Sequence, residues 1–215
     1  MDDYTLDHFF QPSRHKERLY RVGLFCLECR RLKSEDRDMY KIMSGIDNGS
    51  TRMQFSKPVI AVVSDYAVAG GLELSLLADL RKMEKSAIMG VFCSRFGVPL
   101  IDGGTVRLPK LIGLSRALDL ILTGHEAYDF GLPNRVVPDG QIFQCALELA
   151  ERISAFPQHC MRADRTSADY SMYDALCFTE AMQCEFDNAK DVILKESISG
   201  AKKFTSGTGR QGKFT

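Results

Sequence analysis

The stretch that decides the fold reads PVIAVVSDYAVAGGLELSLLAD and covers residues 58–79. Its first six residues form an apolar run rich in β-branched side chains, which is typical of a strand buried on both faces. From Gly71 onward the leucines recur at the spacing of one helical face. Because Gly70 and Gly71 stand between the two parts, the stretch predicts a strand, a glycine turn and a helix.

The helix start at these glycines has a chemistry of its own. The first backbone N–H groups of a helix lack partners inside it, and the dipole adds about half a positive charge there. Such an end stabilises an oxyanion, and a glycine lets a ligand approach the backbone closely. The alternative is a turn that needs glycine for packing alone, with Glu73 as a first-turn acid. The spacing leaves both open, whereas a dinucleotide site fits worse because G-x-G-x-x-G is absent.

Outside this stretch the chain divides into three parts. Residues 1–56 are charged and carry little pattern, so we treat them as a divergent N-terminal segment. Residues 57–139 contain further short strands and two helices, one beginning near Gly103 and one ending at Gly124. Residues 140–215 are mostly helical. The pattern predicts an α/β core followed by a helical C-terminal subdomain.

Charge and composition exclude several kinds of partner. Lys and Arg together number 28, as do Asp and Glu, so the balance predicts binding neither to nucleic acid nor to an anionic membrane surface. The apolar runs are far shorter than the roughly 20 residues that cross a bilayer. Cys26 and Cys29 form one C-x-x-C, but no second pair follows at ligand spacing, so we expect no metal site.

Compartment is predicted from the first residues and from the cysteines. The opening residues carry neither the apolar segment of a signal peptide nor the acid-poor character of a transit peptide. Seven cysteines, an odd number, indicate reduced thiols. We therefore expect an intracellular protein of the cytoplasm or the mitochondrial matrix.

Three segments together carry a resemblance to a known family. They are KPVIAVVSDYAVAGGLELSLLADLR (57–81), GVPLIDGGTVRLPKLIGLSRALDLILTG (97–124) and GLPNRVVP (131–138). Their order and spacing resemble the enoyl-CoA hydratase/isomerase, or crotonase, superfamily. The resemblance implies a ββα spiral core, here incomplete at the N-terminus, and a helical C-terminal region that forms trimers and covers the CoA. It also implies an acyl-CoA thioester substrate, no cofactor besides that CoA, and a homotrimer or hexamer.

The resemblance also implies roles for individual residues. Gly70 matches the glycine whose N–H is one of two donors to the thioester oxyanion, and the neighbouring Ala69 matches a substrate-binding position. Glu73 matches one of the two catalytic glutamates. The second oxyanion donor falls within GLFCLECRRL (23–32), where the register assigns it to the N–H of Leu27.

The second catalytic glutamate of the family is replaced in this sequence. Counted from Glu73 without a gap, its place falls on Cys93, which then lines the substrate site. A thiol is a poor substitute for a carboxylate that exchanges protons with water. Asp102 is the nearest other carboxylate and is predicted to be the second catalytic acid, the N-cap of the helix beginning near Gly103, or both.

Two functions follow from these residues. The first is an enoyl-CoA hydratase-like enzyme, a hydratase or isomerase, in which Gly70 polarises the thioester and Glu73 is the general acid/base. The second is a catalytically silent paralogue or isoform that binds acyl-CoA or assembles with full-length subunits; a fragment unstable by itself is a third option. Lys213, in the basic tail, is either a solvated cation or a contact for the phosphates of CoA.

Overall fold

The chain folds into two compact units, which are described separately. The computed structural model describes residues 23–27, 55 and 57–209. The first unit is Met1–Ile153 and the second is Ser154–Thr215. The mixture of parallel strands and helices in the first unit and the helical second unit confirm the predicted fold class.

The first unit winds its chain between two sheets of parallel strands. One sheet has the order β1-β2-β4-β6, and the other pairs β3 with β5. Along the chain, β2 is followed by β3 and then by a helix, and β4 is followed by β5 and then by helices. This succession is the predicted ββα repeat. The strands are β1 (Gly23–Leu27), β2 (Val59–Val63), β3 (Tyr66–Val68), β4 (Leu80–Glu84), β5 (Ile88–Gly90) and β6 (Arg135–Val137).

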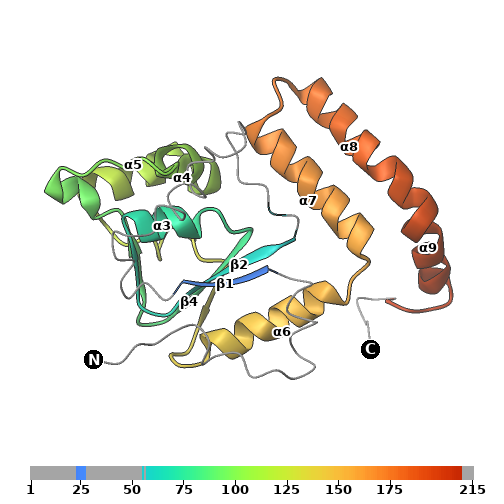
Figure 1. Ribbon diagram of the computed structural model, residues 1–215, viewed down its shortest axis with the longest axis horizontal. Helices are drawn as coiled ribbons and strands as arrows, with labels where there is room; N and C mark the ends of the chain where they lie inside the picture. Colours follow the sequence, from blue (N-terminus) through green and yellow to red (C-terminus); the bar gives the residue numbers. More distant parts are fainter. Residues whose placement is uncertain (1–22, 28–54, 56, 210–215) are drawn as a thin grey trace. The chain divides into compact units, whose positions relative to one another are not determined.

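Helices cover both faces of β2, as its composition predicts. Ile60 and Val62 pack in one cluster with the apolar face of α6 (Ile142–Ser154). Val59 and Ala61, which point the other way, pack with residues of α3 (Gly70–Ser75) and of the turn that follows it. The two helices lie on opposite sides of the sheet (Figure 1). A parallel strand between two helical layers has no solvent face, which is why its sequence is apolar throughout.

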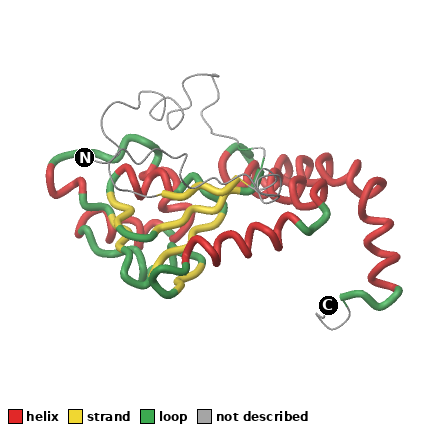
Figure 2. The backbone as a smooth tube through the Cα atoms, turned by 60° about the horizontal axis from the view of Figure 1, so that its bottom comes forward, coloured by secondary structure: helices red, strands yellow, loops and turns green. Residues whose placement is uncertain are grey.

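A further apolar cluster joins both sheets to the helices α4 (Gly104–Ile112) and α5 (Leu114–Thr123). Gly124 ends α5 in the left-handed conformation, with φ 67°, which confirms the predicted stop. Figure 2 shows the strands of this unit flanked by helices on either side. The buried members of the cluster from these elements include Val63, Ala67, Met83, Met89, Leu108, Ala117 and Leu120.

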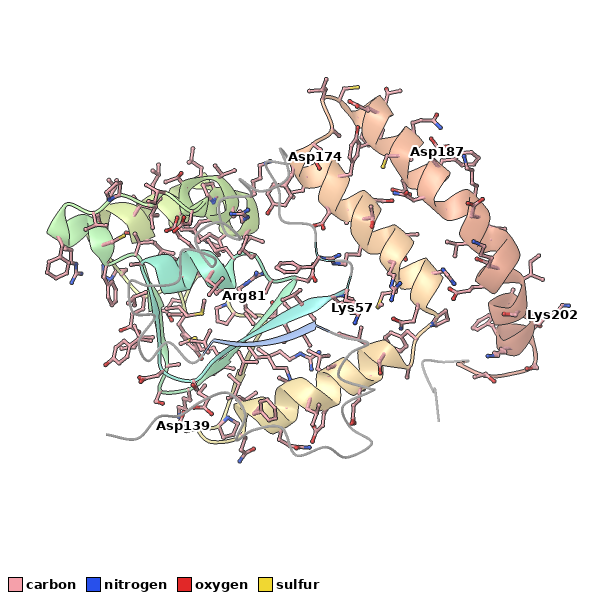
Figure 3. The ribbon with its side chains drawn as sticks, viewed as in Figure 1. Lys57, Arg81, Asp139, Asp174, Asp187 and Lys202 are labelled. Atoms are coloured by element: carbon pink, nitrogen blue, oxygen red, sulfur yellow. The ribbon has the colours of Figure 1, made fainter. Side chains whose placement is uncertain are left out.

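A buried arginine ties α3 to the sheet. Arg81 of β4 has an exposed fraction of only 4%, and its Nη1 donates to the carbonyl of Ala78 at 2.8 Å. Its Nε donates to the carbonyl of Leu132 at 3.1 Å, and its backbone N–H donates to Oδ1 of Asn134 at 2.7 Å. The Arg81 side chain is labelled in Figure 3. These bonds hold the end of the α3 segment and the approach to β6 against β4.

The boundary between the units differs from the predicted one. The sequence groups α6 with a helical C-terminal region that begins at residue 140, whereas the contacts divide the chain after residue 153. The physical reason lies in the partners of α6. Glu84 of β4 accepts the N–H of Gly140 at 2.7 Å and that of Ile142 at 3.4 Å, which anchors the start of the helix to the sheet. Helical periodicity alone does not tell which layer a helix covers.

The second unit consists of consecutive helices: a short loop at residues 174–177 leads from the first to the second, and the later helical segments follow without a break (Figure 2). They are α7 (Gln158–Tyr173), α8 (Phe178–Val192), the π-helical turn η3 (Ile193–Ser197) and α9 (Ile198–Thr205). In η3, Glu196 accepts the backbone N–H groups of His159 at 3.2 Å and Cys160 at 2.8 Å, at the start of α7. The helical character confirms the prediction, but the π-turn has no signal in the sequence. Within the described ranges, the helices are too short or too polar to traverse a bilayer.

Candidate active site

The site is built around Glu73 in α3. Its neighbours Leu72 and Leu74 are buried because this short helix is covered on most sides. Glu73 is buried as well, with an exposed fraction of 3%. A carboxylate in such a place is costly unless polar partners compensate for the lost water.

Two backbone amides supply those partners. Oε1 of Glu73 accepts the N–H of Asp102 at 2.9 Å and the N–H of Gly104 at 2.9 Å. Both donors belong to the loop that leads into α4, about thirty residues further along the chain. Hydrogen bonds to an ionised acceptor are stronger than neutral ones, so they fix the carboxylate in one orientation.

Burial dominates the ionisation of Glu73. Loss of water raises the pKa of its carboxyl above the ordinary value of 4.5, although the N–H groups of Gly104 and Asp102 lower it in part. The negative charge of Asp102 adds to the increase. A carboxyl group whose pKa is raised toward the working pH exchanges a proton more readily than an ordinary surface acid. Glu73 is therefore suited to general acid/base chemistry.

Asp102 does not cap α4, so the N-cap alternative is wrong. The N-cap is Gly103, with φ 90°, and no side chain caps this helix. The Asp102 side chain is half-buried, and its Oδ1 is shielded from solvent without a hydrogen-bond partner among the described residues. Buried carboxylate oxygens normally have partners, so this oxygen is available to a group that enters the site beside Glu73.

Gly70 faces open space. A Cβ added to it would meet no atom of the described residues within 4 Å, and its φ is not in the left-handed range. Neither packing nor backbone conformation therefore requires glycine here, which argues against the alternative that the turn needs glycine for packing alone. The described residues thus leave room for a ligand to reach the backbone at the start of α3.

Ala69, directly before Gly70, has a strained backbone. Its φ of 52° and ψ of −123° make it the one non-glycine residue with positive φ in the described part of the chain. Such conformations cost about 1–3 kcal/mol and persist only where surrounding contacts enforce them. Here the N–H of Ala69 donates to the carbonyl of Gly90 at 3.3 Å, and its carbonyl accepts the N–H of Glu73 at 3.1 Å.

The remaining predicted residues lie in different surroundings. Leu27 ends β1 and pairs with Val63, the last residue of β2. Its backbone therefore lies at the carboxyl ends of these strands, where the chain leaves β2 toward Gly70. Cys93 is buried in the apolar cluster and starts the short helical turn η2 (Cys93–Phe96). Lys213 lies outside the described residues. The structure thus brings Glu73 and Asp102 together and places Cys93 in the core.

Two site residues have no role in the sequence-based prediction. A Cβ on Gly104 would lie 2.8 Å from Oε1 and 2.9 Å from Cγ of Glu73, so this glycine makes room for the acid. Arg107 donates from Nη1 to the carbonyl of Asp102 at 3.0 Å. The adjacent glycines at 103 and 104 are the only local signal that could have pointed to this close approach.

A chain wound as ββα turns between two parallel sheets, with an acid from one turn held by the loop of the next, has the crotonase fold. Among solved structures it is similar to an enoyl-CoA hydratase from Bacillus anthracis, at 30% identity and a TM-score of 0.68, covering 84% of this chain and 71% of that one. An enoyl-CoA hydratase subunit from Geobacillus kaustophilus gives a TM-score of 0.65 at 31% identity, covering 70% and 60% of the two chains.

The family follows from the sequence match. The model of the enoyl-CoA hydratase/isomerase family matches residues 29–206, and the chain belongs to this family. An enoyl-CoA hydratase of Mycobacterium tuberculosis is 41% identical over 107 residues, which are 47% of this chain and 40% of that protein. A mitochondrial enoyl-CoA hydratase domain-containing protein of Mus musculus is 35% identical over 159 residues, covering 70% and 53%. The chain thus spans about half the length of these relatives or less.

Proposed function

We propose that this protein is an enoyl-CoA hydratase-like enzyme acting on an acyl-CoA thioester, with Glu73 as its general acid/base. The observation that carries the proposal is the Glu73 carboxylate, which is 3% exposed and fixed by two backbone amides. Its helix begins at Gly70, over which the described residues leave open space. The substrate class comes from the family, whose Mycobacterium tuberculosis member named above is an enoyl-CoA hydratase.

The proposed reaction uses the start of α3 to stabilise charge. The thioester oxygen accepts the N–H of Gly70, and we assign the second donor to the N–H of Leu27 at the end of β1. Charge that develops on this oxygen in an enolate-type transition state is then stabilised, and each such donor is worth about 2.7–4 kcal/mol. No cofactor is needed beyond the CoA that is part of the substrate.

Glu73 and Asp102 share the proton transfers in this proposal. In hydration, one carboxylate takes a proton from the water that attacks C3, and a carboxylic acid delivers a proton to C2. In isomerisation, a carboxylate removes a proton from one carbon, and an acid returns a proton to another. The unsatisfied Oδ1 of Asp102 supports a share in either reaction, since Cys93 is buried in the apolar cluster.

Assembly and compartment stay predictions of the same proposal. A homotrimer or hexamer would cover apolar side chains that the second unit exposes, among them Leu176 at 92% and Phe178 at 79%. Lys213 is assigned to the phosphates of CoA, and the compartment to the cytoplasm or the mitochondrial matrix.

A catalytically silent member of the family is the second candidate function. The position of Cys93 favours it, because the thiol at the place of the second glutamate lies in the apolar cluster. Such a protein would bind acyl-CoA or assemble with full-length subunits without turning substrate over.

One experiment separates the two candidates. Purified wild-type protein, Glu73→Gln and Asp102→Asn are each incubated with a short 2-enoyl-CoA, and loss of the conjugated thioester absorbance is followed. If wild type is active and Glu73→Gln is not, the enzyme is supported. If Asp102→Asn also loses activity relative to wild type, the two-carboxylate mechanism is supported. Binding of acyl-CoA by an inactive wild-type protein would replace the enzyme with the silent family member.

A further inference from the structure

The loop that holds Glu73 is itself held from the opposite side. Three polar groups of its backbone, all within residues 102–104, are involved. The N–H of Asp102 and the N–H of Gly104 both donate to Oε1 of Glu73. The carbonyl of Asp102, which lies between these donors along the chain, accepts a hydrogen bond from Nη1 of Arg107 at 3.0 Å.

We propose that Arg107 is a positioning residue for the general acid/base, which it controls through the peptide group between Asp102 and Gly103. This inference rests on the role that the proposed function gives to Glu73. A peptide group is planar, so a guanidinium bonded to its carbonyl restrains the whole group. The amides of Asp102 and Gly104 belong to the peptides on either side, each joined to this group through one Cα, so the restraint limits their movement. Arg107 thereby keeps both donors aimed at the Glu73 carboxylate.

The two glycines of the loop make room for the two charged groups. A Cβ on Gly103 would collide with Nη1 of Arg107, so the guanidinium occupies the space that a side chain would need. A Cβ on Gly104 would lie 2.8 Å from Oε1 of Glu73. Gly103 also has φ 90°, a conformation that favours glycine. The pair therefore allows an arginine to approach one peptide and a glutamate to approach the next.

The helix keeps the arginine in place. The backbone N–H of Arg107 donates to the carbonyl of Gly103 at 2.9 Å, within the first turn of α4. Long side chains on a helix point back toward its N-terminus, which brings this guanidinium over residues 102 and 103. The Arg107 side chain is half-buried, so solvent competes only partly for its bond to the carbonyl.

Removal of the guanidinium has a defined electrostatic consequence. The charged side chain that acts on Glu73 is Asp102, whose negative charge raises the pKa of Glu73. When the carbonyl is released, the amides of Asp102 and Gly104 donate less well to Glu73. Because those two bonds lower the pKa of Glu73 against the effect of burial, weakening them raises that pKa further.

The test compares Arg107→Met with Arg116→Met, a matched control on the exposed side of α5. Two quantities are measured: the acidic limb of the pH profile of kcat/KM, and the pH at which Glu73 titrates in the folded protein. The second comes from the difference in unfolding free energy between each protein and the same protein carrying the additional change Glu73→Gln, followed against pH. We expect Arg107→Met to move the acidic limb and the Glu73 titration to higher pH by about one unit, which lowers the activity on that limb roughly tenfold. Arg116→Met should move neither the limb nor the titration.

The titration is independent of activity, so it separates this inference from the proposed function. If the wild-type protein is inactive but Arg107→Met still shifts the titration, the positioning role holds and the proposed function fails. An unshifted titration in folded Arg107→Met overturns the inference. Arg107→Lys keeps a cationic donor, so its titration should shift less than that of Arg107→Met. If Arg107→Met does not fold, Arg107→Gln takes its place.

Discussion

Glu73 in the first unit and Glu196 in the second have the same kind of partners. Each accepts two backbone N–H groups at or near the start of a helix: those of Asp102 and Gly104 beside α4, and those of His159 and Cys160 in α7. Their ionisation nevertheless changes in opposite directions. The pKa of Glu73 is raised, chiefly by burial, whereas the N–H of Cys160 chiefly lowers the pKa of Glu196.

The difference shows that hydrogen bonds alone do not make a catalytic acid. Two amide donors stabilise a carboxylate in either place, but only in α3 does the loss of water outweigh them. Glu196 stays an anion that stabilises the start of a helix, as expected for an acid near the positive end of the dipole. Glu73 is held equally firmly but loses its hydration, which leaves it ready to take up a proton.

The largest effect is expected when each acid becomes an amide. Glu73→Gln should lower the rate of enoyl-CoA turnover by at least about 100-fold, because a positioned acid/base is typically worth that much or more. Glu196→Gln should leave the rate within about twofold, since Glu196 serves the second unit as a cap. Loss of the conjugated thioester absorbance measures both. Equal losses in the two variants would contradict the contrast drawn between them.

A methyl group placed against Glu73 should destabilise the first unit. Gly104→Ala puts a Cβ 2.8 Å from Oε1 of Glu73, so the loop must move and unfolding should become easier by about 1–3 kcal/mol. Gly200→Ala in α9 is the control, because its Cβ would meet nothing within 4 Å among the described residues and alanine favours a helix. Urea unfolding compares the two, and a stable Gly104→Ala would show that the loop yields freely.

Replacing an alanine by glycine at the start of α3 should change the stability by a smaller amount. The N-cap of α3 is the strained Ala69, with φ 52°, whereas the N-cap of α7 is Pro157, with an ordinary φ of −56°. Ala69→Gly relieves about 1–3 kcal/mol of strain but loses about 0.5–1 kcal/mol to chain entropy, so a net gain of about 1 kcal/mol is expected. Ala163→Gly within α7 should instead lose about 1 kcal/mol. Thermal melts that shift the same way in both would refute the strain.

The smallest effect is the pH dependence of stability. The folded pKa of Glu73 lies above the unfolded value of 4.5, so its contribution is fully present below that pH and is lost as the pH rises through the folded value. Glu196 is the reverse: its folded pKa is lowered, so its contribution is present above pH 4.5 and is lost as the pH falls through the folded value.

Chemical unfolding between about pH 3 and pH 8 measures this contrast. As the pH rises, Glu73→Gln should become more stable relative to wild type. As the pH rises through the acidic part of the range, Glu196→Gln should become less stable relative to wild type. Parallel curves for the two variants would mean that burial does not distinguish the acids.

Much of the fold could be predicted from short patterns. The apolar run at residues 58–63 predicts β2 because a strand covered on both faces has no polar side. The leucines after Gly71 predict a helix, but α3 ends at Ser75, so Leu76 and Leu77 lie in the turn after it and Leu80 begins β4. Gly124 correctly predicts the end of α5. The start of the second unit could not be predicted, because a helical pattern indicates that a segment is a helix but not which elements it packs against, and α6 packs on the sheet of the first unit.

The candidate site could be predicted only in part. Gly70 and Glu73 come from one local stretch and from the family resemblance, and Asp102 stands out as the nearest other acid. The loop amides that hold Glu73 and the arginine behind them carry no local pattern, because backbone donors look alike in any sequence. The rejection of Asp102 as an N-cap also needed the structure, since Gly103 takes that place.

The sequence by itself determined which segments become strands and helices, where glycine interrupts them, and which family the chain resembles, because these depend on neighbours within a few residues. The tertiary structure alone decided how Glu73 ionises. Its two donors are 29 and 31 residues away, and its burial requires α3 and the loop before α4 to come together. Desolvation is a property of the packed surroundings, so it arises only when those distant segments meet.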